Sequence, residues 1–378
     1  MTEDDGVESA ETYREFGRER ARTNGAGAEA AVRDLHGLLA DADDVDAAEH
    51  LEHARAVRER LPARYRAEFE GLAAELSVPE AELTLWTFAG GDAVTDLGGD
   101  ADGGDGAADG SGEGCTNATV EAARAAGEAP LVLKNRDRSG RGLAPQSVLE
   151  VPSMGGRHGL LTVTTACHPF VFQGVNDAGL VAANSYVSRA RESVPEAERL
   201  PNGVLVRRVL EECDSVAAAR ALVESLPLER SKGLTLSLAD AGSAVLLEVD
   251  PQPAEARVVE ADGGAVASAN HFPGRSEDAA GTSSDYRLSR ASTLLSDVAD
   301  GVGVEDLFAL ARDHRNGPGP NSVCRHPSDE HGDPFVLTES TTLSTTVYRG
   351  GEPTLWATVG NPCESRVGRY RLRGAGVE

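Results

Sequence analysis

The spacing of hydrophobic residues changes once along the chain, and the change divides it into parts. From residue 8 to about 90, apolar residues recur every three to four positions in a charged, alanine-rich background, which predicts amphipathic helices. Residues 96–114 are almost entirely Gly, Asp, Ala and Ser, so we expect a self-repelling linker with nothing to bury. We therefore predict a helical N-terminal segment (1–95), serving as propeptide or small subunit, the acidic linker (96–114) and a core (115–378).

In the core, short apolar runs separated by turn signals predict strands. One run pair flanks Asn176, Asp177, Ala178 and Gly179, a typical hairpin turn. Further strands are expected in 129–139, 158–165, 233–250, 256–270 and 344–360, and residues 256–270 are expected to continue the sheet of 233–250. Helices are expected in 201–227, 284–300 and 303–314. Hairpins alternating with helix pairs indicate an α+β domain of antiparallel sheets with helices outside them.

The charge balance is strongly acidic. Lys and Arg total 36 against 62 Asp and Glu, a net charge of −26, and Lys134 and Lys232 are the two lysines of the chain. Lysine scarcity with an acidic excess favours adaptation to molar salt over ordinary acidic solubility, because charge repulsion is then screened within about 3 Å. Such a surface would repel nucleic acid and anionic membranes, so neither is an expected partner.

The five cysteines are widely spaced, which argues against a disulfide framework or a four-cysteine zinc site. Most are expected to be buried thiols. The segment containing Cys324, His326 and His331 matches no strong zinc pattern, so no metal and no cofactor are expected. An acidic N-terminus and the lack of any long apolar run favour a cytoplasmic protein.

Cys115 differs from the other cysteines because it directly follows the linker. A thiol needs a base to become a nucleophile. Cleavage between Gly114 and Cys115 would free an α-amine with a reference pKa near 7.7–8. Such an amine can act as base for the thiol of its own residue. By itself, the short sequence around Cys115 favours a buried or incidental thiol over a nucleophile.

Further polar motifs follow Cys115 at the ends of predicted strands and on one helix. They are KNRD (134–137), GVNDAGLVAANSY (174–186), ANHF (269–272) and SSDYRLSR (283–290). Each has an ordinary structural explanation, as a strand end, turn, cap or solvated helix face. Because successive strand residues point to opposite faces, Arg136 should face away from Asn135 and Asp137.

Taken together and in this order, these motifs resemble the acyl-coenzyme A:6-aminopenicillanate (isopenicillin N) acyltransferase-like family of autoproteolytic N-terminal-nucleophile (Ntn) hydrolases. The resemblance extends to residues 60–88 and covers about 55–365; bile salt hydrolases and penicillin V acylases are more distant relatives. The acidic linker looks like an insertion. The resemblance implies an αββα four-layer sandwich with a helical N-terminal segment.

The resemblance also implies roles for residues. Cys115 would be the nucleophile, self-cleavage would occur at Gly114–Cys115, and Asp137 would hold the freed amine. Asn176 and the region of Asn270 would stabilise the oxyanion. Arg287, or Arg290 if the register differs by one turn, would be the site arginine. Supporting candidates are Arg136, Asn135, Asn184 and His271.

The implied function is cleavage or transfer of an acyl group at a linear amide through an acyl-thioester on Cys115. Expected partners are a small amide or acyl-donor substrate and the chain's own N-terminal fragment, and a homo-oligomer is compatible with the sequence. Two alternatives stay open: a catalytically silent binding protein of the same fold, and a metal-dependent hydrolase using His326 and His331.

Overall fold

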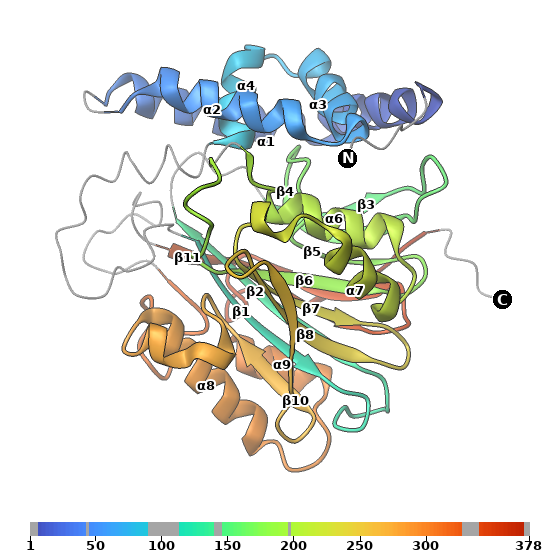
Figure 1. Ribbon diagram of the computed structural model, residues 1–378, viewed down its shortest axis with the longest axis vertical. Helices are drawn as coiled ribbons and strands as arrows, with labels where there is room; N and C mark the ends of the chain where they lie inside the picture. The colour runs from blue at the N-terminus through green and yellow to red at the C-terminus, as the bar shows by residue number, and fades with distance from the viewer. Residues whose placement is uncertain are drawn as a thin grey trace.

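A computed structural model describes residues 7–42, 45–89, 113–139, 146–195, 198–326 and 340–373. Within them, two stacked β-sheets lie between helical layers, and further helices form a cap at one end (Figure 1). This is the αββα arrangement that the resemblance implies, and the α+β prediction is confirmed. The predicted linker lies outside the described residues except for Glu113 and Gly114.

The cap consists of α1 (Val7–Ala40), α2 (Ala47–Arg60), α3 (Ala63–Glu75) and α4 (Glu80–Phe88). The other helices are α6 (Asn202–Glu212), α7 (Val216–Ser225), α8 (Ser283–Asp297) and α9 (Val304–Ala311), with short 3₁₀ segments η2 (Leu228–Arg230) and η3 (Pro273–Ala279). None of the described helices is both long and apolar enough to span a membrane.

The six-stranded sheet has the order β10 (Ala265–Ser268), β1 (Glu113–Val120), β2 (Leu131–Ser139), β11 (Ser340–Arg349), β12 (Thr354–Val359) and β13 (Gly368–Arg371). The seven-stranded sheet has the order β3 (Gln146–Val151), β4 (Leu160–Thr165), β5 (Gln173–Asn176), β6 (Val181–Tyr186), β7 (Leu234–Ala239), β8 (Ala244–Asp250) and β9 (Glu255–Val259). The strand pairs of both sheets are antiparallel.

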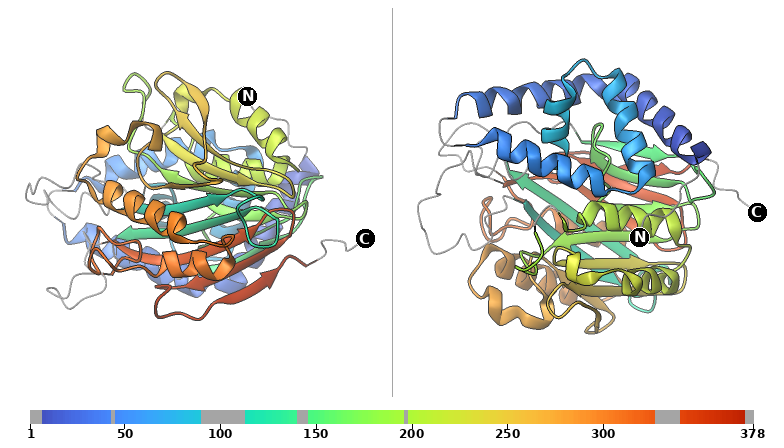
Figure 2. Two further views of the ribbon diagram at one scale, coloured as in Figure 1. Left: turned by 90° about the horizontal axis from the view of Figure 1, so that it is seen from below. Right: turned by 45° about the horizontal axis from the view of Figure 1, so that its top comes forward.

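Helices α6 and α7 pack on the seven-stranded sheet, and α8 and α9 pack on the six-stranded sheet (Figures 1 and 2). Strand alternation decides which side chains enter each layer. On β2, Leu131 and Leu133 join the apolar cluster beneath α8 and α9, whereas Val132 joins the cluster between the sheets. On β1, the Thr119 hydroxyl donates to Ser237 of β7 across the sheet interface. Cys115 therefore lies on the inter-sheet face of β1, because its position and that of Thr119 differ by an even number.

The prediction that residues 256–270 continue one sheet is wrong for their second half. Strand β9 extends the seven-stranded sheet, but β10 pairs with β1 in the other sheet. Gly263 and Gly264 between them have φ of 59° and 79°, a left-handed conformation that glycine adopts without strain. This turn lets the chain pass from one sheet to the other, and it brings Asn270 beside β1.

The cap is joined to the core by buried charges. Glu68 of α3 pairs with Arg20 of α1 and, at 2.6 Å, with Arg207 of α6. Arg207 also pairs with Glu211, which in turn accepts from Arg64 of α3 at 3.1 Å. All five side chains are at most 4% exposed. Buried ions of this kind are tolerated only when each has its partner, so the cap and α6 depend on each other for charge compensation.

Candidate active site

Cys115 is buried and lines a cavity that extends from the sheet interface to the cap. Its partner across the antiparallel β1–β2 ladder is Arg136, which places both side chains on one face. Lys134 lies on that same face, two residues from Arg136. The cavity is therefore built on the alternate residues of β2 that face the other sheet.

The ammonium group of Lys134 is the polar group nearest to the thiol for which a hydrogen bond is described. Its Nζ lies 3.1 Å from Cys115 Sγ and also donates to the main-chain carbonyl of Asn184 on β6. Lys134 therefore gives the sulfur of Cys115 a hydrogen-bond donor inside the cavity. Lys134 was not among the site residues predicted from the sequence. Its rarity, as one of two lysines, was the signal available.

The backbone of Cys115 is held by two of the predicted residues. Its N–H donates to Asn270 Oδ1 at 3.1 Å, and its carbonyl oxygen accepts from Arg287 Nη1. Arg287 Nη2 donates to the same Asn270 oxygen at 2.6 Å, and Nη1 to Thr116 Oγ1 at 3.0 Å. The Asn270 amide nitrogen donates to the carbonyl of Tyr186. Asn270 and Arg287 thus fix the residue that carries the thiol.

Helix α8 explains why Arg287 and not Arg290 occupies this position. Its buried residues are Ser284, Arg287, Ala291 and Leu295, a stripe with helical spacing that faces β1 and β10. Arg290 lies off this stripe and forms a two-bonded ion pair with Asp313. Of the two alternatives, Arg287 is therefore the arginine beside Cys115.

Asp137 lies on the opposite face of β2 from Lys134, next to Gly114. It is paired with Gly114 across the ladder, and its Oδ1 accepts from Thr342 at 2.7 Å. Its Oδ2 is buried without a hydrogen-bond partner, 3.5 Å from Nε of Arg325. A β-carbon on Gly114 would come 2.4 Å from Arg325 Nη1 and 3.1 Å from Asp137 Oδ2. An incompletely bonded carboxylate therefore sits beside the Gly114–Cys115 bond, together with Arg325, which sequence reasoning did not identify.

The structure separates the two asparagines of the GVNDAGLVAANSY motif. Asn176 donates both amide hydrogens to the carbonyls of Leu210 and Cys213, and its Oδ1 accepts from Leu180 N–H. It fixes the β5–β6 turn against the end of α6 and does not line the cavity. Its geometry does not support the predicted oxyanion role. Asn184 of β6, named only as a supporting candidate, does line the cavity, and its Oδ1 is buried without a partner.

Of the remaining supporting candidates, Arg136 lines the cavity, whereas Asn135 and His271 contact other parts of the chain. Arg136 lines the cavity, stacks on Phe172 at 4.6 Å and donates to Gln146. Asn135 faces the other way and bonds to Ala311, Val323 and Thr345, so the predicted alternation along KNRD is confirmed. His271 shares a 2.7 Å hydrogen bond with Ser284, whose oxygen also accepts from Asn270 N–H. His271 and Ser284 thus steady the loop that carries Asn270.

The cavity wall combines aromatic and cationic side chains. The cap contributes Trp86 and Phe88, and the segment before β5 contributes His168, Phe170 and Phe172. Burial, with the charges of Arg138, Arg136 and Arg20, lowers the pKa of His168 well below its usual value, so it is a neutral ring at pH 7. The basic residues that line the cavity are Lys134, Arg136, Arg138, Arg199 and Lys232. Among the described lining residues, Asp137 carries the one carboxylate, so basic residues predominate. Both lysines of the chain are in this set.

Solved structures similar to this chain include the penicillin V acylase of Agrobacterium tumefaciens (15% identity, 69% of this chain and 87% of that one, TM-score 0.47). A mutant of conjugated bile acid hydrolase from Clostridium perfringens is similar at 12% identity (68% and 97% covered, TM-score 0.43). A Caenorhabditis elegans orthologue of N-acylethanolamine-hydrolyzing acid amidase is similar at 12% identity (63% and 94% covered, TM-score 0.44). None of the curated proteins matches this sequence.

The sequence profile of one family matches residues 124–364, which is more than half of the chain and includes β2, β6, Asn270 and α8. The family is described as acyl-coenzyme A:6-aminopenicillanic acid acyl-transferase. Family, layered architecture and the grouping of Cys115 with Asn270 and Arg287 agree with one another. The chain belongs to the acyl-coenzyme A:6-aminopenicillanic acid acyl-transferase family.

Proposed function

We propose that this protein is an amidohydrolase or acyltransferase that cuts itself between Gly114 and Cys115 and then uses Cys115 as an N-terminal nucleophile. The observation that carries the proposal is the Cys115 thiol in a cavity, 3.1 Å from the Lys134 ammonium, with its backbone held by Asn270 and Arg287.

Self-cleavage would begin with attack of the Cys115 sulfur on the Gly114 carbonyl carbon. The C–N bond breaks, the nitrogen takes a proton, and Gly114 becomes the acyl part of a thioester. Water then hydrolyses the thioester, which releases the Gly114 carboxylate and restores the thiol. The freed amine would lie where the Cys115 N–H now donates to Asn270 Oδ1. Asp137 is paired with Gly114 across the ladder, and its Oδ2 has no hydrogen bond although it lies 3.5 Å from Arg325 Nε, so we propose this oxygen as an acceptor for the new ammonium.

Turnover would use the same groups on a substrate amide. The α-amine takes the thiol proton, the sulfur attacks the carbonyl carbon, and the oxyanion accepts from the Asn184 amide. Collapse transfers a proton from the α-ammonium to the leaving amine and leaves an acyl-thioester on Cys115. Water or a second amine then resolves the thioester, giving hydrolysis or acyl transfer respectively.

The cavity lining supports a substrate with an apolar acyl group and a negative charge. Trp86, Phe88, Phe170 and Phe172 offer apolar surface, and the cationic side chains listed above lie among them. Charge complementarity of this kind selects among ligands more than it adds affinity. We therefore expect an N-acyl amino acid, which carries a carboxylate, to react faster than the uncharged amide of the same acyl group.

The deciding experiment is the intact mass of the protein purified in concentrated KCl, beside Cys115→Ala. The expected result is a fragment of residues 115–378 that is absent from the variant. An uncut chain in both would overturn self-processing and favour a non-catalytic binding protein. Where the fragment forms, matched charged and uncharged N-acyl substrates test the substrate class, and equal kcat/KM values for the two would contradict it.

We also propose that the protein works in molar salt, as the net charge of −26 and the scarcity of lysine suggest. Below about 0.5 M salt, repulsion between the surface carboxylates reaches beyond about 4 Å and should destabilise the fold. Circular dichroism across a KCl series measures this, and an unchanged spectrum in dilute buffer would rule the proposal out.

A further inference from the structure

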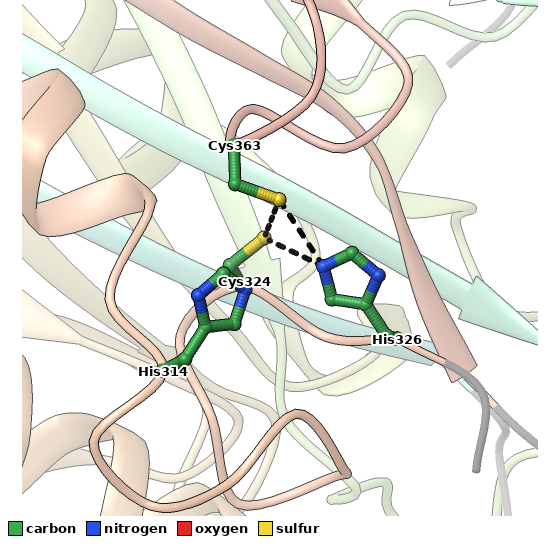
Figure 3. Close-up of side chains that lie close together, drawn as sticks. All are labelled: His314, Cys324, His326 and Cys363. Carbon is green, nitrogen blue, oxygen red and sulfur yellow. Dashed lines mark hydrogen bonds between the residues drawn. The ribbon is translucent and has the colours of Figure 1, made fainter. Parts of the chain in front are cut away.

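Four side chains that the proposed function does not use meet at one edge of the molecule. They are His314, after α9; Cys324 and His326, from the loop that follows; and Cys363, after β12 (Figure 3). Their ligand atoms all lie within 4.8 Å of one another. Cys324 is buried, both histidines are half-buried and Cys363 is exposed, so the group is accessible from solvent.

The distances among Cys324, His326 and Cys363 are close to the edges of a metal-centred tetrahedron. With Zn–S of about 2.3 Å and Zn–N of about 2.0 Å, two thiolates are about 3.8 Å apart and a thiolate and an imidazole nitrogen about 3.5 Å. Here the two sulfurs are 3.7 Å apart, and His326 Nε2 lies 3.6 Å from Cys324 Sγ and 3.2 Å from Cys363 Sγ. A disulfide needs a sulfur separation of about 2.05 Å, so the sulfurs are spaced for a shared ligand.

The histidines are arranged as metal ligands usually are. His314 Nε2 is buried and forms no hydrogen bond with the described residues, which is costly unless another group fills the position. The second ring nitrogen of His326, Nδ1, lies 4.0 Å from the Glu364 carboxylate. A carboxylate behind the ligating imidazole is the common outer partner in zinc sites and orients the ring.

We infer that His314, Cys324, His326 and Cys363 form a tetrahedral binding site for a zinc ion. Two thiolates and two imidazoles are the ligand set that selects zinc among the abundant divalent ions. Since the protein supplies all four ligands, no position is left for water, and the site is structural. This differs from the metal-dependent hydrolase considered from the sequence, whose other ligand, His331, lies outside the described residues.

The ion would hold the loop that carries Arg325. This residue stands between two of the ligands, and its guanidinium reaches Ser283 at 2.6 Å and Asp137 at 3.5 Å. Its carbonyl accepts from Asn361, two residues before Cys363. The zinc site would therefore tie the segment after β12 to the loop that presents Arg325 beside Gly114.

The test uses the full chain with Cys115→Ala, which removes the nucleophile as a competing thiolate. Purified under reducing conditions, it should contain one zinc per chain by mass spectrometry. Replacement with Co²⁺ should give the thiolate charge-transfer and tetrahedral ligand-field bands. Chelation should lower the melting temperature. Cys363→Ser should lose the cobalt spectrum and the effect of chelation, and Cys213→Ser, a buried thiol at the end of α6, should keep both.

Three outcomes would overturn the site. The first is the absence of zinc with no cobalt bands at millimolar Co²⁺. The second is metal binding that Cys363→Ser and His314→Ala leave unchanged. The third is a chain without zinc, lighter by two hydrogens, in which Cys324 and Cys363 are joined as a disulfide. If Cys363→Ser fails to fold, His314→Cys can replace it in the test, because this variant keeps four ligands. A changed cobalt spectrum in His314→Cys would support the site, and an unchanged spectrum would contradict it.

Discussion

The ammonium group of Lys134 lies 3.1 Å from the sulfur of Cys115, and the two side chains come from adjacent antiparallel strands on the face between the sheets. The contact gives the buried sulfur a hydrogen-bond donor inside the cavity. It also links the six-stranded sheet to Asn184 of the seven-stranded sheet, through the main-chain carbonyl of that residue.

Replacing Lys134 should therefore impair the nucleophile. We expect Lys134→Met to lower kcat/KM by about 10²-fold or more, as when other charge partners of a transition state are removed, and Lys134→Arg to restore part of it. The rate of Cys115 alkylation by iodoacetamide at pH 7 should fall as well. Lys232→Met removes a charge from the same cavity and should leave that rate unchanged. A fall of equal size in both variants would contradict a specific role for Lys134.

The two asparagines of one motif should behave differently when changed. Asn184→Ala should lower kcat by about 10²–10³-fold with little change in stability, the usual cost of losing one oxyanion donor. Asn176→Ala breaks three hydrogen bonds at the β5–β6 turn, so it should lower the free energy of unfolding by about 1–3 kcal/mol. Measurements of kcat and of denaturant unfolding on both variants test whether Asn184 is the oxyanion donor and Asn176 a structural residue. A large loss of kcat in Asn176→Ala, with a loss of stability in Asn184→Ala, would instead assign the oxyanion role to Asn176.

Gly114 should be required for self-cleavage because a β-carbon has no space there. In Gly114→Ala the new carbon would meet Arg325 at 2.4 Å, which displaces the guanidinium or the scissile bond. A displacement of about 1 Å at a reacting centre costs about 10²-fold in rate, so the 115–378 fragment should accumulate about that much more slowly. Gly242→Ala, where nothing lies within 4 Å of the added carbon, is the matched control. Wild-type processing in Gly114→Ala would contradict the tight packing at this position.

After cleavage the cap should stay on the core, because the buried ion network crosses between them. Glu68→Ala leaves Arg20 and Arg207 without their shared partner and should cost about 3–5 kcal/mol of unfolding free energy. Glu70→Ala, on the same helix but in an exposed pair with Arg14, should cost about 1 kcal/mol or less. Denaturant unfolding at one fixed salt concentration compares the two variants. Co-purification shows whether the cap fragment separates from the core fragment. Equal costs would mean that the buried network contributes no more than a surface pair.

The sequence predicted those site residues and turns that a short local pattern marks. Cys115 stood out because it ends an acidic, glycine-rich run, and the Asn176–Gly179 turn was readable because Gly179, at φ 84°, occupies a position that favours glycine. The sequence predicted helix α8 and both arginine candidates on it, but not which of its residues are buried. Only packing against β1 distinguished Arg287 from Arg290, since the choice depends on how the helix is rotated over the sheet.

What the sequence did not reveal depends on contacts between distant segments. His314 and Cys363 are 49 residues apart, so no local spacing links them, although they meet in space. Lys134 was read as part of KNRD, but its role follows from the ladder register that sets it diagonally across from Cys115. Asn176 and Asn184 share one motif, and only the three-dimensional structure shows which of them faces the cavity.

The placement of both lysines in the cavity lining makes the chain a selective target for amine chemistry. Thirty-four of the 36 basic residues are arginines, which acylating reagents for primary amines do not modify. An amine reagent small enough to enter would meet Lys134, Lys232 and, if the chain is cut as proposed, the new α-amine of Cys115. Labelling without engineered residues could thus report on how open the site is.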